Sequence, residues 1–438
     1  MIPDPGAEAE HPPLPDDRPV PWDLLPDSAG VVDDGWFAVG GCSTADLVRE
    51  FGTPLFVYDE EHLRARCREA VDTFGDGVSY AGKAFLCLAM ARLVHEEGMH
   101  LDVATGGEMH VALRAGMPAE RLVLHGNNKS EAELQRAREV GVGRIVVDSF
   151  DELDRLDRLH AADGRRPRIL LRATPGVQAH THEFVQTGQV DSKFGFGVAA
   201  GDLGKAVERA SASPSVELIG VHTHIGSQIF VAAFFRQAID VIAPWVRDLD
   251  LPELSLGGGL GVPYVAGEEA PTLSQWGRVV IDACREAGIR ARVTAEPGRV
   301  IAARAAVTLY TVGTVKDIPG VRTYVAVDGG MSDNPRPVLY GSGYEAFLPR
   351  AVDAPRPRTV TVVGKHCESG DVLVRDARVP ADLRVGDILA TPVTGAYGHS
   401  MGSNYNKVPR PAVVFASDGD ARLVVRRETE DDLVRLDL

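Results

Sequence analysis

A lysine follows the short apolar run 78–81, in a stretch that reads Tyr80-Ala81-Gly82-Lys83. Burial disfavours the ammonium form, so a lysine at the end of a buried strand is shifted toward the neutral amine. The neutral amine is the form that attacks a carbonyl to make a Schiff base. A lone lysine is more often one whose stem covers apolar surface while its head reaches water. Lys83 therefore needs further residues to support a catalytic role.

The segment 222–224 reads His-Thr-His, a spacing that places both histidines on the same face of a strand. Such a pair binds zinc in some barrel hydrolases when further ligands are present, and His125, Asp148 and Glu296 are the candidates here. The alternative is that one histidine stacks on a flat cofactor while Ser227 meets an anion. Both interpretations stay open on this evidence alone.

Two glycine-containing turns each follow a strand-like run. The first, 257–259, is a row of three glycines whose bare backbone amides suit a phosphate, and a tight turn alone would need only one of them. The second holds Gly298 and Arg299 after Glu296. A carboxylate at this place keeps a pyridine nitrogen protonated, and a protonated ring is a strong electron sink. As a surface ion pair, Glu296 and Arg299 would contribute little.

Eight strand-like runs, most of them separated by helical patterns, must position these residues. The runs are 78–81, 101–104, 122–125, 144–147, 168–173, 218–224, 254–256 and 292–295. Strands that alternate with helices pair in parallel through right-handed crossovers, and eight such units in about 250 residues match a (β/α)8 barrel of the TIM type. An open doubly wound sheet is the alternative.

Each run is followed at its end by a polar residue or by glycines. They are Lys83, Asp102, His125, Asp148, Arg172, His224, Gly257 to Gly259, and Glu296. In a (β/α)8 barrel the rim at the C-terminal ends of the strands carries the active site, and the opposite rim serves stability. We therefore expect these side chains to face one another across one rim.

The pattern changes after residue 304 to β-type segments with turn signals, which predicts a mostly antiparallel β domain of the sandwich or barrel kind. The short pieces at 27–54 are expected to join it. The predicted units are thus a barrel at 55–304 and a β domain made of 27–54 with 305–438. Residues 1–26 are rich in Pro, Asp and Glu, which indicates a disordered or loosely draped tail.

Composition excludes several classes of protein. The chain has 438 residues and a net charge of -16 with dispersed basic residues, which argues against a nucleic-acid partner. The five cysteines contain no C-x-x-C pair, so neither a disulfide framework nor a thiolate zinc site is indicated. No apolar run is long enough to span a membrane and no secretory signal is apparent, so we expect a cytoplasmic protein without a membrane partner.

A Schiff-base lysine, a ring-stacking histidine, two phosphate turns and a pyridinium partner together point to pyridoxal 5'-phosphate. The sequence resembles the fold-type III pyridoxal-phosphate-dependent decarboxylases over nearly the whole chain after about residue 30. The motifs that carry the resemblance are 80–83, 222–228, the three glycines at 257–259, 296–299, 331–337, 367–371 and 395–397.

The resemblance implies a role for each matching residue. Lys83 is implied to bond the cofactor, His224 to stack on its ring, and Glu296 to face the ring nitrogen. The other implied cofactor contacts are Ser227, Gly258, Gly259, Gly298, Arg299 and Tyr397. The implied substrate contacts are Arg299, Arg336, Tyr340, Glu368 and Tyr397, with the arginines on a far carboxylate and Glu368 on a far ammonium. No metal is implied.

The resemblance also implies a homodimer in which Cys367 and Glu368 enter the partner's active site, with Cys367 as a proton donor. Independently of the family, Cys367 lies in a glycine-bounded loop beside His366 and Glu368. Such polar surroundings are typical of a reactive thiol. A plain buried cysteine is equally compatible with the sequence alone.

Arginines for a far carboxylate and an acid for a far ammonium suit a substrate with two amino-acid ends. The expected reaction is therefore decarboxylation of meso-2,6-diaminopimelate to L-lysine and CO2. A decarboxylase of ornithine or lysine would need only the acid. The alternatives are a sibling enzyme acting on another diamino acid such as carboxynorspermidine, a metal-dependent barrel hydrolase, and a non-catalytic carrier of pyridoxal phosphate.

Overall fold

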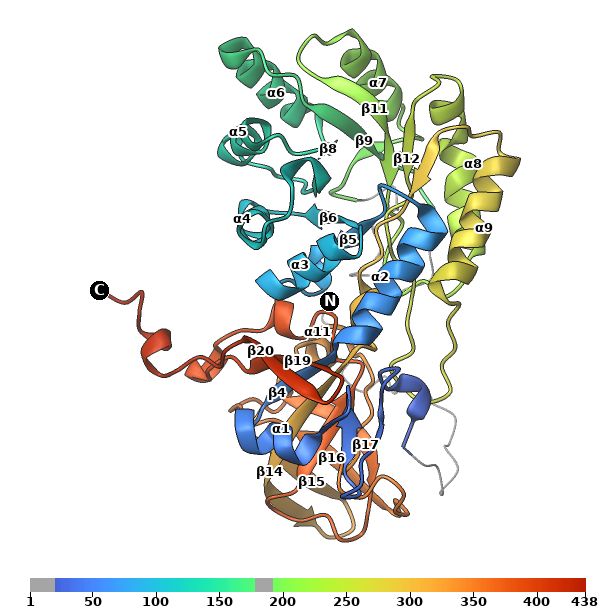
Figure 1. Ribbon diagram of the computed structural model, residues 1–438. Coiled ribbons are helices and arrows are strands. Elements are labelled where there is room, and N and C mark those ends of the chain that lie inside the picture. Colours follow the sequence, from blue (N-terminus) through green and yellow to red (C-terminus); the bar gives the residue numbers. More distant parts are fainter. Residues whose placement is uncertain (1–19, 178–191) are drawn as a thin grey trace.

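The computed structural model describes residues 20–177 and 192–438. Figure 1 shows two parts, one above the other. The upper part contains parallel strands with helices around them, and the lower part contains the remaining sheets. The N-terminal segment, in dark blue, and the C-terminal segment, in orange and red, both belong to the lower part.

Eight strands in the described part of the chain pair in parallel, in the order β13-β12-β11-β9-β8-β7-β6-β5. Their bounds are β5 Ser79–Ala81, β6 His100–Val103, β7 Leu122–Leu124, β8 Arg144–Val147, β9 Arg168–Thr174, β11 Glu217–Thr223, β12 Glu253–Ser255 and β13 Arg292–Thr294. A short strand, β10 (Phe196–Gly197), also pairs with β9. Each of the eight predicted runs coincides with one of these strands, so the predicted barrel class is confirmed.

Two backbone hydrogen bonds join the last strand of this sheet to the first. The N–H of Ser79 donates to the carbonyl of Ala295 at 2.9 Å, and that of Ala81 donates to the carbonyl of Pro297 at 3.2 Å. An open doubly wound sheet would leave its two edge strands apart, so that alternative is wrong. The closure also brings the turn that carries Lys83 alongside the end of β13.

Helices surround the barrel strands and cover their outer side (Figure 1). They are α2 Glu60–Phe74, α3 Leu88–Glu96, α4 Gly106–Ala115, α5 Glu131–Val140, α6 Phe150–Asp163, α7 Asp202–Ala212, α8 Ala233–Arg247 and α9 Leu273–Glu286. Local sequence fixes their ends. Ser130 and Thr272 begin α5 and α9 with capping boxes. Gly116 and Gly141 follow α4 and α5 in the left-handed conformation that favours glycine.

The second large sheet has the order β17-β16-β15-β14-β4-β19-β20, and β18 also pairs with β14. The bounds are β4 Leu55–Asp59, β14 Ala306–Ile318, β15 Arg322–Val327, β16 Arg358–Val363, β17 Val372–Val379, β18 Ile388–Pro392, β19 Ala412–Ser417 and β20 Asp420–Val425. Most pairs are antiparallel, whereas β15 with β16 and β4 with β19 are parallel. The predicted second component, rich in antiparallel strands, is therefore present.

Strand β4 differs from its predicted place, because the sequence assigns residue 55 onward to the barrel. In the structure β4 lies between β14 and β19 in the second sheet. All five of its residues are buried, and an apolar run of this kind looks the same in either sheet. We propose that the barrel unit begins at residue 60, where α2 starts.

The N-terminal segment forms a small antiparallel sheet of β1 (Gly30–Val31), β2 (Phe37–Val39) and β3 (Cys42–Ser43), followed by α1 (Thr44–Phe51). Its core residue Phe37 belongs to the same buried cluster as Val57 and Val307 of the second large sheet. On the basis of this packing we propose that residues 27–54 belong to the β domain.

The predicted N-terminal tail is only partly within the described residues. Residues 1–19 of that tail lie outside them. In the remainder, η1 (Trp22–Leu24) is a 3-10 turn, and Val20, Leu24 and Leu25 are buried. The prediction of a draped tail is therefore wrong for residues 20–26. Three apolar side chains suffice to dock a short segment that has no periodic pattern of its own.

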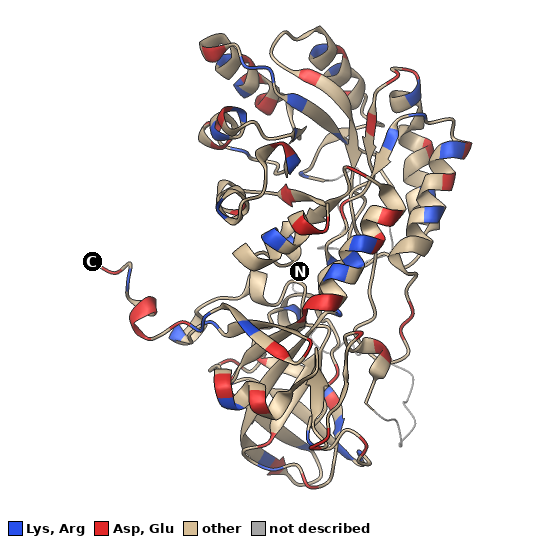
Figure 2. Ribbon diagram, in the orientation of Figure 1, with Lys and Arg blue, Asp and Glu red and all other residues tan. Residues whose placement is uncertain are grey.

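Charged residues of both signs occur on several of the visible helices (Figure 2). On α2, for example, Arg64 pairs with Glu60 and with Glu97, both at 2.8 Å. Each such surface pair contributes little to stability by itself. Within the described ranges, no helix has the combined length and apolar character needed to cross a membrane.

Two histidines packed away from the main cavity predict acid sensitivity of the fold. Burial and Arg144 lower the pKa of His100 to about 4, and burial and Arg410 lower the pKa of His399 to about 3. In the unfolded chain a histidine titrates near 6.5, so below that pH the unfolded state binds more protons. Their contribution to stability is therefore present above about pH 6.5 and is lost as pH falls toward 4.

We expect the free energy of unfolding in urea to fall between pH 7 and pH 5 by up to about 1.4 kcal/mol per pH unit for each of these histidines. His399 packs edge-on against Phe56 and Phe85, so a phenyl ring can replace it. The variant His399→Phe should show a shallower dependence on pH than the wild type. Identical slopes for the two proteins would contradict this assignment.

Candidate active site

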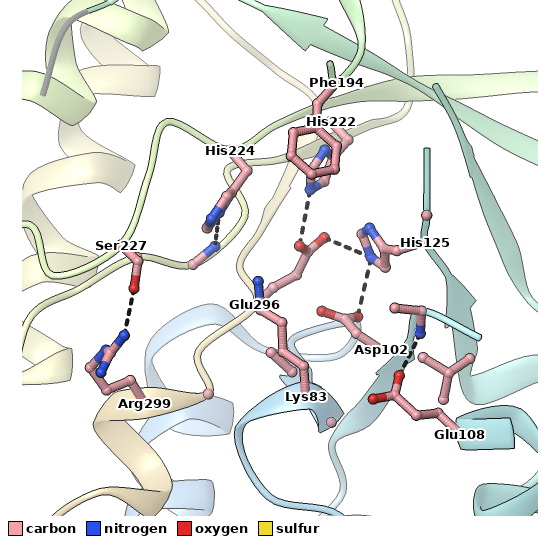
Figure 3. A pocket seen from close by; sticks show the side chains of 18 of the residues that line it. Lys83, Asp102, Glu108, His125, Phe194, His222, His224, Ser227, Glu296 and Arg299 are labelled. Carbon is pink, nitrogen blue, oxygen red and sulfur yellow. Dashed lines mark hydrogen bonds and ion pairs between the residues drawn. The ribbon is translucent and has the colours of Figure 1, made fainter. Parts of the chain in front are cut away.

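A cavity of about 320 Å³ lies at the C-terminal ends of the barrel strands (Figure 3). Every residue that the sequence predicts to hold the cofactor lines it: Lys83, His224, Ser227, Gly258, Gly259, Glu296, Gly298, Arg299 and Tyr397. Asp102, His125 and Arg172 from the predicted rim line it as well. Asp148 does not line it and instead lies 3.5 Å from Arg172. The expected gathering of polar side chains at one rim is thus present.

Lys83 lies in a 3-10 turn, η2 (Gly82–Ala84), directly after β5, and its side chain points into the cavity (Figure 3). The second domain holds this turn, because the N–H of Tyr397 and the hydroxyl of Ser400 both donate to the carbonyl of Ala84, at 2.8 Å and 3.1 Å. The Lys83 side chain is exposed within the open cavity.

Glu296 is held by three neighbours. Nε2 of His222 lies 2.9 Å from its carboxylate, the Ser255 hydroxyl donates to it at 2.7 Å, and Nε2 of His125 lies 3.6 Å away. Burial alone would raise the pKa of Glu296, but the charges of His222 and His125 and the hydrogen bonds from His222 and Ser255 lower it well below its ordinary value. Glu296 is therefore an anion at neutral pH.

Asp102 approaches the same ring nitrogen of His125 as Glu296 does, with 3.7 Å between its carboxylate and Nε2 of the histidine (Figure 3). Burial and the like charge of Glu296 raise the pKa of Asp102 well above its ordinary value. The two carboxyl groups are thus pushed to opposite protonation states, with a proton kept on Asp102 and the charge kept on Glu296. Glu296 is the carboxylate suited to a cationic ring nitrogen.

His224 follows β11, and its Nδ1 accepts a hydrogen bond from the N–H of Gly258 at 3.2 Å. Burial, Lys83 and Arg172 lower the pKa of His224 well below its ordinary value, so the ring is neutral. A flat neutral ring at the cavity wall suits stacking on a flat cofactor. The two histidines predicted on one strand face both line the cavity, His222 toward Glu296 and His224 toward the glycine turn.

The glycine turn is fixed against the loop after β11. The Gln228 side chain donates to the carbonyl of Val262 at 2.7 Å and accepts from its N–H at 3.1 Å. A Cβ on Gly259 would lie 2.2 Å from the carbonyl of Gly226, so only glycine fits there. Within the described residues the amides of Gly259 and Gly298 donate no hydrogen bond. Free amides of this kind suit a phosphate.

Two further site residues were not predicted from the sequence. Ser255 orients Glu296, and its signal was a polar residue inside an apolar strand, two positions before the glycine row. Tyr264 accepts hydrogen bonds from Arg299, at 2.6 Å, and from Arg336. It lies in an irregular segment after the glycine row, where no periodic pattern marks a side chain as buried.

The predicted substrate residues are only partly brought together. Arg336 lies in α11 (Arg336–Tyr340), behind Tyr264, and its guanidinium is 5.9 Å from the Tyr340 ring centre. Neither Arg336 nor Tyr340 lines the cavity. Cys367 and Glu368 are exposed and do not line it either. The interpretation of Cys367 as a plain buried cysteine is therefore wrong.

The cavity matches the three functional groups of pyridoxal phosphate. Lys83 offers an amine for the aldehyde, Glu296 a carboxylate for the ring nitrogen, and the free amides with Ser227 a site for the phosphate. Potential metal-binding atoms of His125, His222 and Glu296 lie within 4.8 Å of one another, so the arrangement behind the zinc interpretation is also present. The amine and the phosphate turn have no part in such a metal site.

Comparison with known proteins supports the cofactor. The family model for the pyridoxal binding domain of pyridoxal-dependent decarboxylases matches residues 60–303. The diaminopimelate decarboxylase of Mycobacterium tuberculosis is 47% identical over 434 residues, which is 94% of this chain and 96% of that protein. That of Bacillus subtilis is 45% identical over 420 residues, 92% of this chain and 95% of that protein.

Comparison with solved structures gives the same family. The diaminopimelate decarboxylase of M. jannaschii in complex with L-lysine has a TM-score of 0.88 at 31% identity, covering 94% of this chain and 98% of that one. The Helicobacter pylori enzyme complexed with L-lysine has a TM-score of 0.83 at 30% identity, covering 90% and 98%.

Fold and site together define a pyridoxal-phosphate enzyme of the (β/α)8 class. Within that class, the chain belongs to the diaminopimelate decarboxylase family of the pyridoxal-dependent decarboxylases. It is a carboxy-lyase and its cofactor is pyridoxal phosphate. The family predicted from the motifs is thereby confirmed. The metal-dependent hydrolase and the non-catalytic carrier are set aside.

Proposed function

We propose that this protein decarboxylates meso-2,6-diaminopimelate to L-lysine and CO2. The observation that carries the choice of substrate is the pair of buried arginines, Arg299 and Arg336, which converge on one point beside the cavity. No carboxylate of the described residues forms an ion pair with either of them. Two buried cations need an anion, and the far carboxylate of diaminopimelate supplies one. The L-lysine bound by two of the related enzymes has the same amino-acid end.

When bound, pyridoxal phosphate supplies an electron sink for the carbon that loses CO2. Lys83 would hold the cofactor through its amine. Glu296 would keep a proton on the ring nitrogen, since it is an anion at neutral pH. His224 would cover one face of the ring. Arg299 and Arg336 hold the far end of the substrate, so that the other end lies at the cofactor.

Substrate analysis tests this function. We expect turnover of the meso isomer with release of L-lysine, and no turnover of carboxynorspermidine. The purified holoenzyme would be incubated with each diaminopimelate stereoisomer and with carboxynorspermidine, and the amines would be identified by mass spectrometry. A faster reaction with carboxynorspermidine would replace the proposal with the sibling activity.

We propose further that the active unit is a homodimer and that it works in the cytoplasm. Cys367 and Glu368 are exposed and lie outside the cavity of their own chain, so a second copy is needed to bring them to a cofactor. Two hydrogen bonds hold the loop, since Asn406 accepts from the Cys367 N–H at 3.3 Å and Tyr405 donates to Glu368. In the dimer, the Cys367 thiol would supply a proton for the product amine and would regain one from solvent.

Mixing two inactive variants is expected to restore activity. A dimer of one Lys83→Ala subunit and one Cys367→Ala subunit contains one site with both native residues, if Cys367 acts on the partner. Random pairing puts half of the subunits in such dimers, so recovery of roughly a quarter of wild-type activity is expected. The measurement is lysine formation after the two proteins are unfolded together and refolded with the cofactor.

The matched control mixes Lys83→Ala with Glu296→Gln. Both residues line the cavity of one and the same chain, so the mixed dimer has no intact site. No recovery is expected from this control. Equal failure of both mixtures would place Cys367 in its own subunit's reaction and contradict the shared site.

A further inference from the structure

A tyrosine hydroxyl joins the two arginines beside the cavity. Tyr264 lies in the segment after the glycine row of the barrel, Arg299 begins α10 (Arg299–Ala302), and Arg336 begins α11 in the second domain. Arg299 donates to the Tyr264 hydroxyl oxygen at 2.6 Å, and Arg336 donates to the same oxygen. The phenol therefore bridges cations that belong to different domains.

All three side chains are buried. Tyr264, Arg299 and Arg336 are 4%, 8% and 4% exposed. Two guanidinium groups this close repel each other, and a shared acceptor offsets part of the repulsion. Burial alone would raise the pKa of Tyr264, but the charges of Arg299 and Arg336 and their hydrogen bonds lower it. The two cations thus act directly on the phenol.

The choice of tyrosine has a chemical consequence. A carboxylate at this position would neutralise one of the arginines and take the place of an incoming anion. A phenol oxygen that keeps its proton accepts from both guanidinium groups and leaves their charge available. The pair can then form charge-assisted hydrogen bonds to a carboxylate that arrives from the cavity. The arginines keep other neutral partners too, Ser227 at 2.8 Å and Ser342 at 2.9 Å.

A ring contact and two backbone hydrogen bonds hold Tyr264 in place. Its ring meets the ring of Tyr344 edge-on, with 5.2 Å between centres and 75° between planes. The N–H of Tyr264 donates to Glu268 at 2.8 Å, and that of Ala266 donates to Glu345 of the second domain at 3.1 Å. With the backbone tied at two points and the ring packed, the hydroxyl stays at one place.

We propose that Tyr264 is a positioning residue that determines substrate specificity, by holding Arg299 and Arg336 at the spacing that binds the far carboxylate of the substrate. The proposal rests on the proposed role of the two arginines. Tyr264 acts through them and has no part in the loss of CO2 itself.

The variant Tyr264→Phe tests this, because it removes the shared oxygen and keeps the ring. We expect KM for meso-2,6-diaminopimelate to rise roughly tenfold, since a hydrogen bond to a charged group is lost on each side, while kcat changes less than about threefold. Inhibition by L-lysine should weaken by a similar factor, because lysine carries the same far end. The absorbance of the bound cofactor should be unchanged, which shows that the variant is folded and loaded.

The matched control is Tyr324→Phe. Tyr324 lies on β15, and the guanidinium of Arg322 is 5.8 Å from its ring centre, so the pair resembles the site in residue type but is far from the cavity. Neither KM nor lysine inhibition should change in this control. A second route to the same effect is Glu345→Ala, which unties the segment that carries Tyr264 and should also raise KM while leaving the cofactor absorbance unchanged.

Arg336→Gln separates failure of the inference from failure of the proposed function. If Arg336→Gln leaves KM unchanged, the arginine pair does not bind the substrate and the proposed substrate contact is wrong. If Arg336→Gln raises KM but neither Tyr264→Phe nor Glu345→Ala does, only the inference about Tyr264 is wrong. The double variant Tyr264→Phe/Arg336→Gln should resemble Arg336→Gln alone, because residues that act as a unit are not additive. Fully additive effects would overturn the inference.

Discussion

Replacing Lys83 by alanine is expected to lower kcat by roughly a thousandfold or more, because the chain loses both its covalent hold on the cofactor and an amine that moves protons. The protein should still fold, since the Lys83 side chain is exposed in the cavity and the backbone of its turn is held by Tyr397 and Ser400. Two measurements check this: lysine formation, and the visible absorbance of protein loaded with pyridoxal phosphate.

The control is Lys205→Ala. Lys205 lies on α7 and pairs with Asp202, 3.0 Å away and also on the surface, so its loss should leave activity and absorbance unchanged. Borohydride treatment of the loaded wild type should label the peptide that contains Lys83 and no peptide that contains Lys205. A visible band that survives in Lys83→Ala, together with retained activity, would falsify the proposed attachment.

Replacing Glu296 by glutamine is expected to lower kcat by roughly a hundredfold, with a smaller effect on KM. Glutamine keeps the shape of the side chain but removes the charge that holds a proton on the ring nitrogen, and electrostatic support of this kind is usually a large part of catalysis. His222 and His125 then lose the anion that they face, at 2.9 Å and 3.6 Å. Steady-state kinetics and the cofactor absorbance measure the change.

A glutamate on the surface provides the comparison for this substitution. Glu286 ends α9 and pairs with the exposed Arg236, so Glu286→Gln should leave kcat unchanged. Because the pKa of Glu296 lies well below its ordinary value, the wild-type rate should show no loss attributable to Glu296 between pH 8 and pH 5. Unchanged kcat in Glu296→Gln would mean that the ring nitrogen has another partner.

Much of the fold was predictable because it repeats. Each barrel strand is an apolar run followed by a helix, and a polar residue at the end of the run marks the functional rim, as Lys83 and His224 do. The sheet to which β4 belongs was not predictable in this way. It is an apolar run like the others, and its partners β14 and β19 lie hundreds of residues away, so no local pattern identifies its sheet.

The residues of the site also differ in how far the sequence could predict them. Residues next to glycine or proline in short motifs, such as Glu296 and Gly298, could be predicted from the sequence, because the motif itself indicates a turn at a strand end. Tyr264 was not predicted, because its partner Arg299 lies 35 residues along the chain and its partner Arg336 meets it only through the contact of two domains.

The position of β4 in the second sheet affects how the chain folds during its synthesis. Synthesis delivers Leu55–Asp59 before the barrel, while the neighbours of this strand on either side appear only with Ala306–Leu309 and with Ala412–Ala416. On the ribosome the barrel can form while β4 has no strand beside it, and both edges of β4 are paired only when β19 has emerged. Slow translation of the segment between β14 and β19 would therefore prolong the time in which an apolar strand with a free edge is open to aggregation.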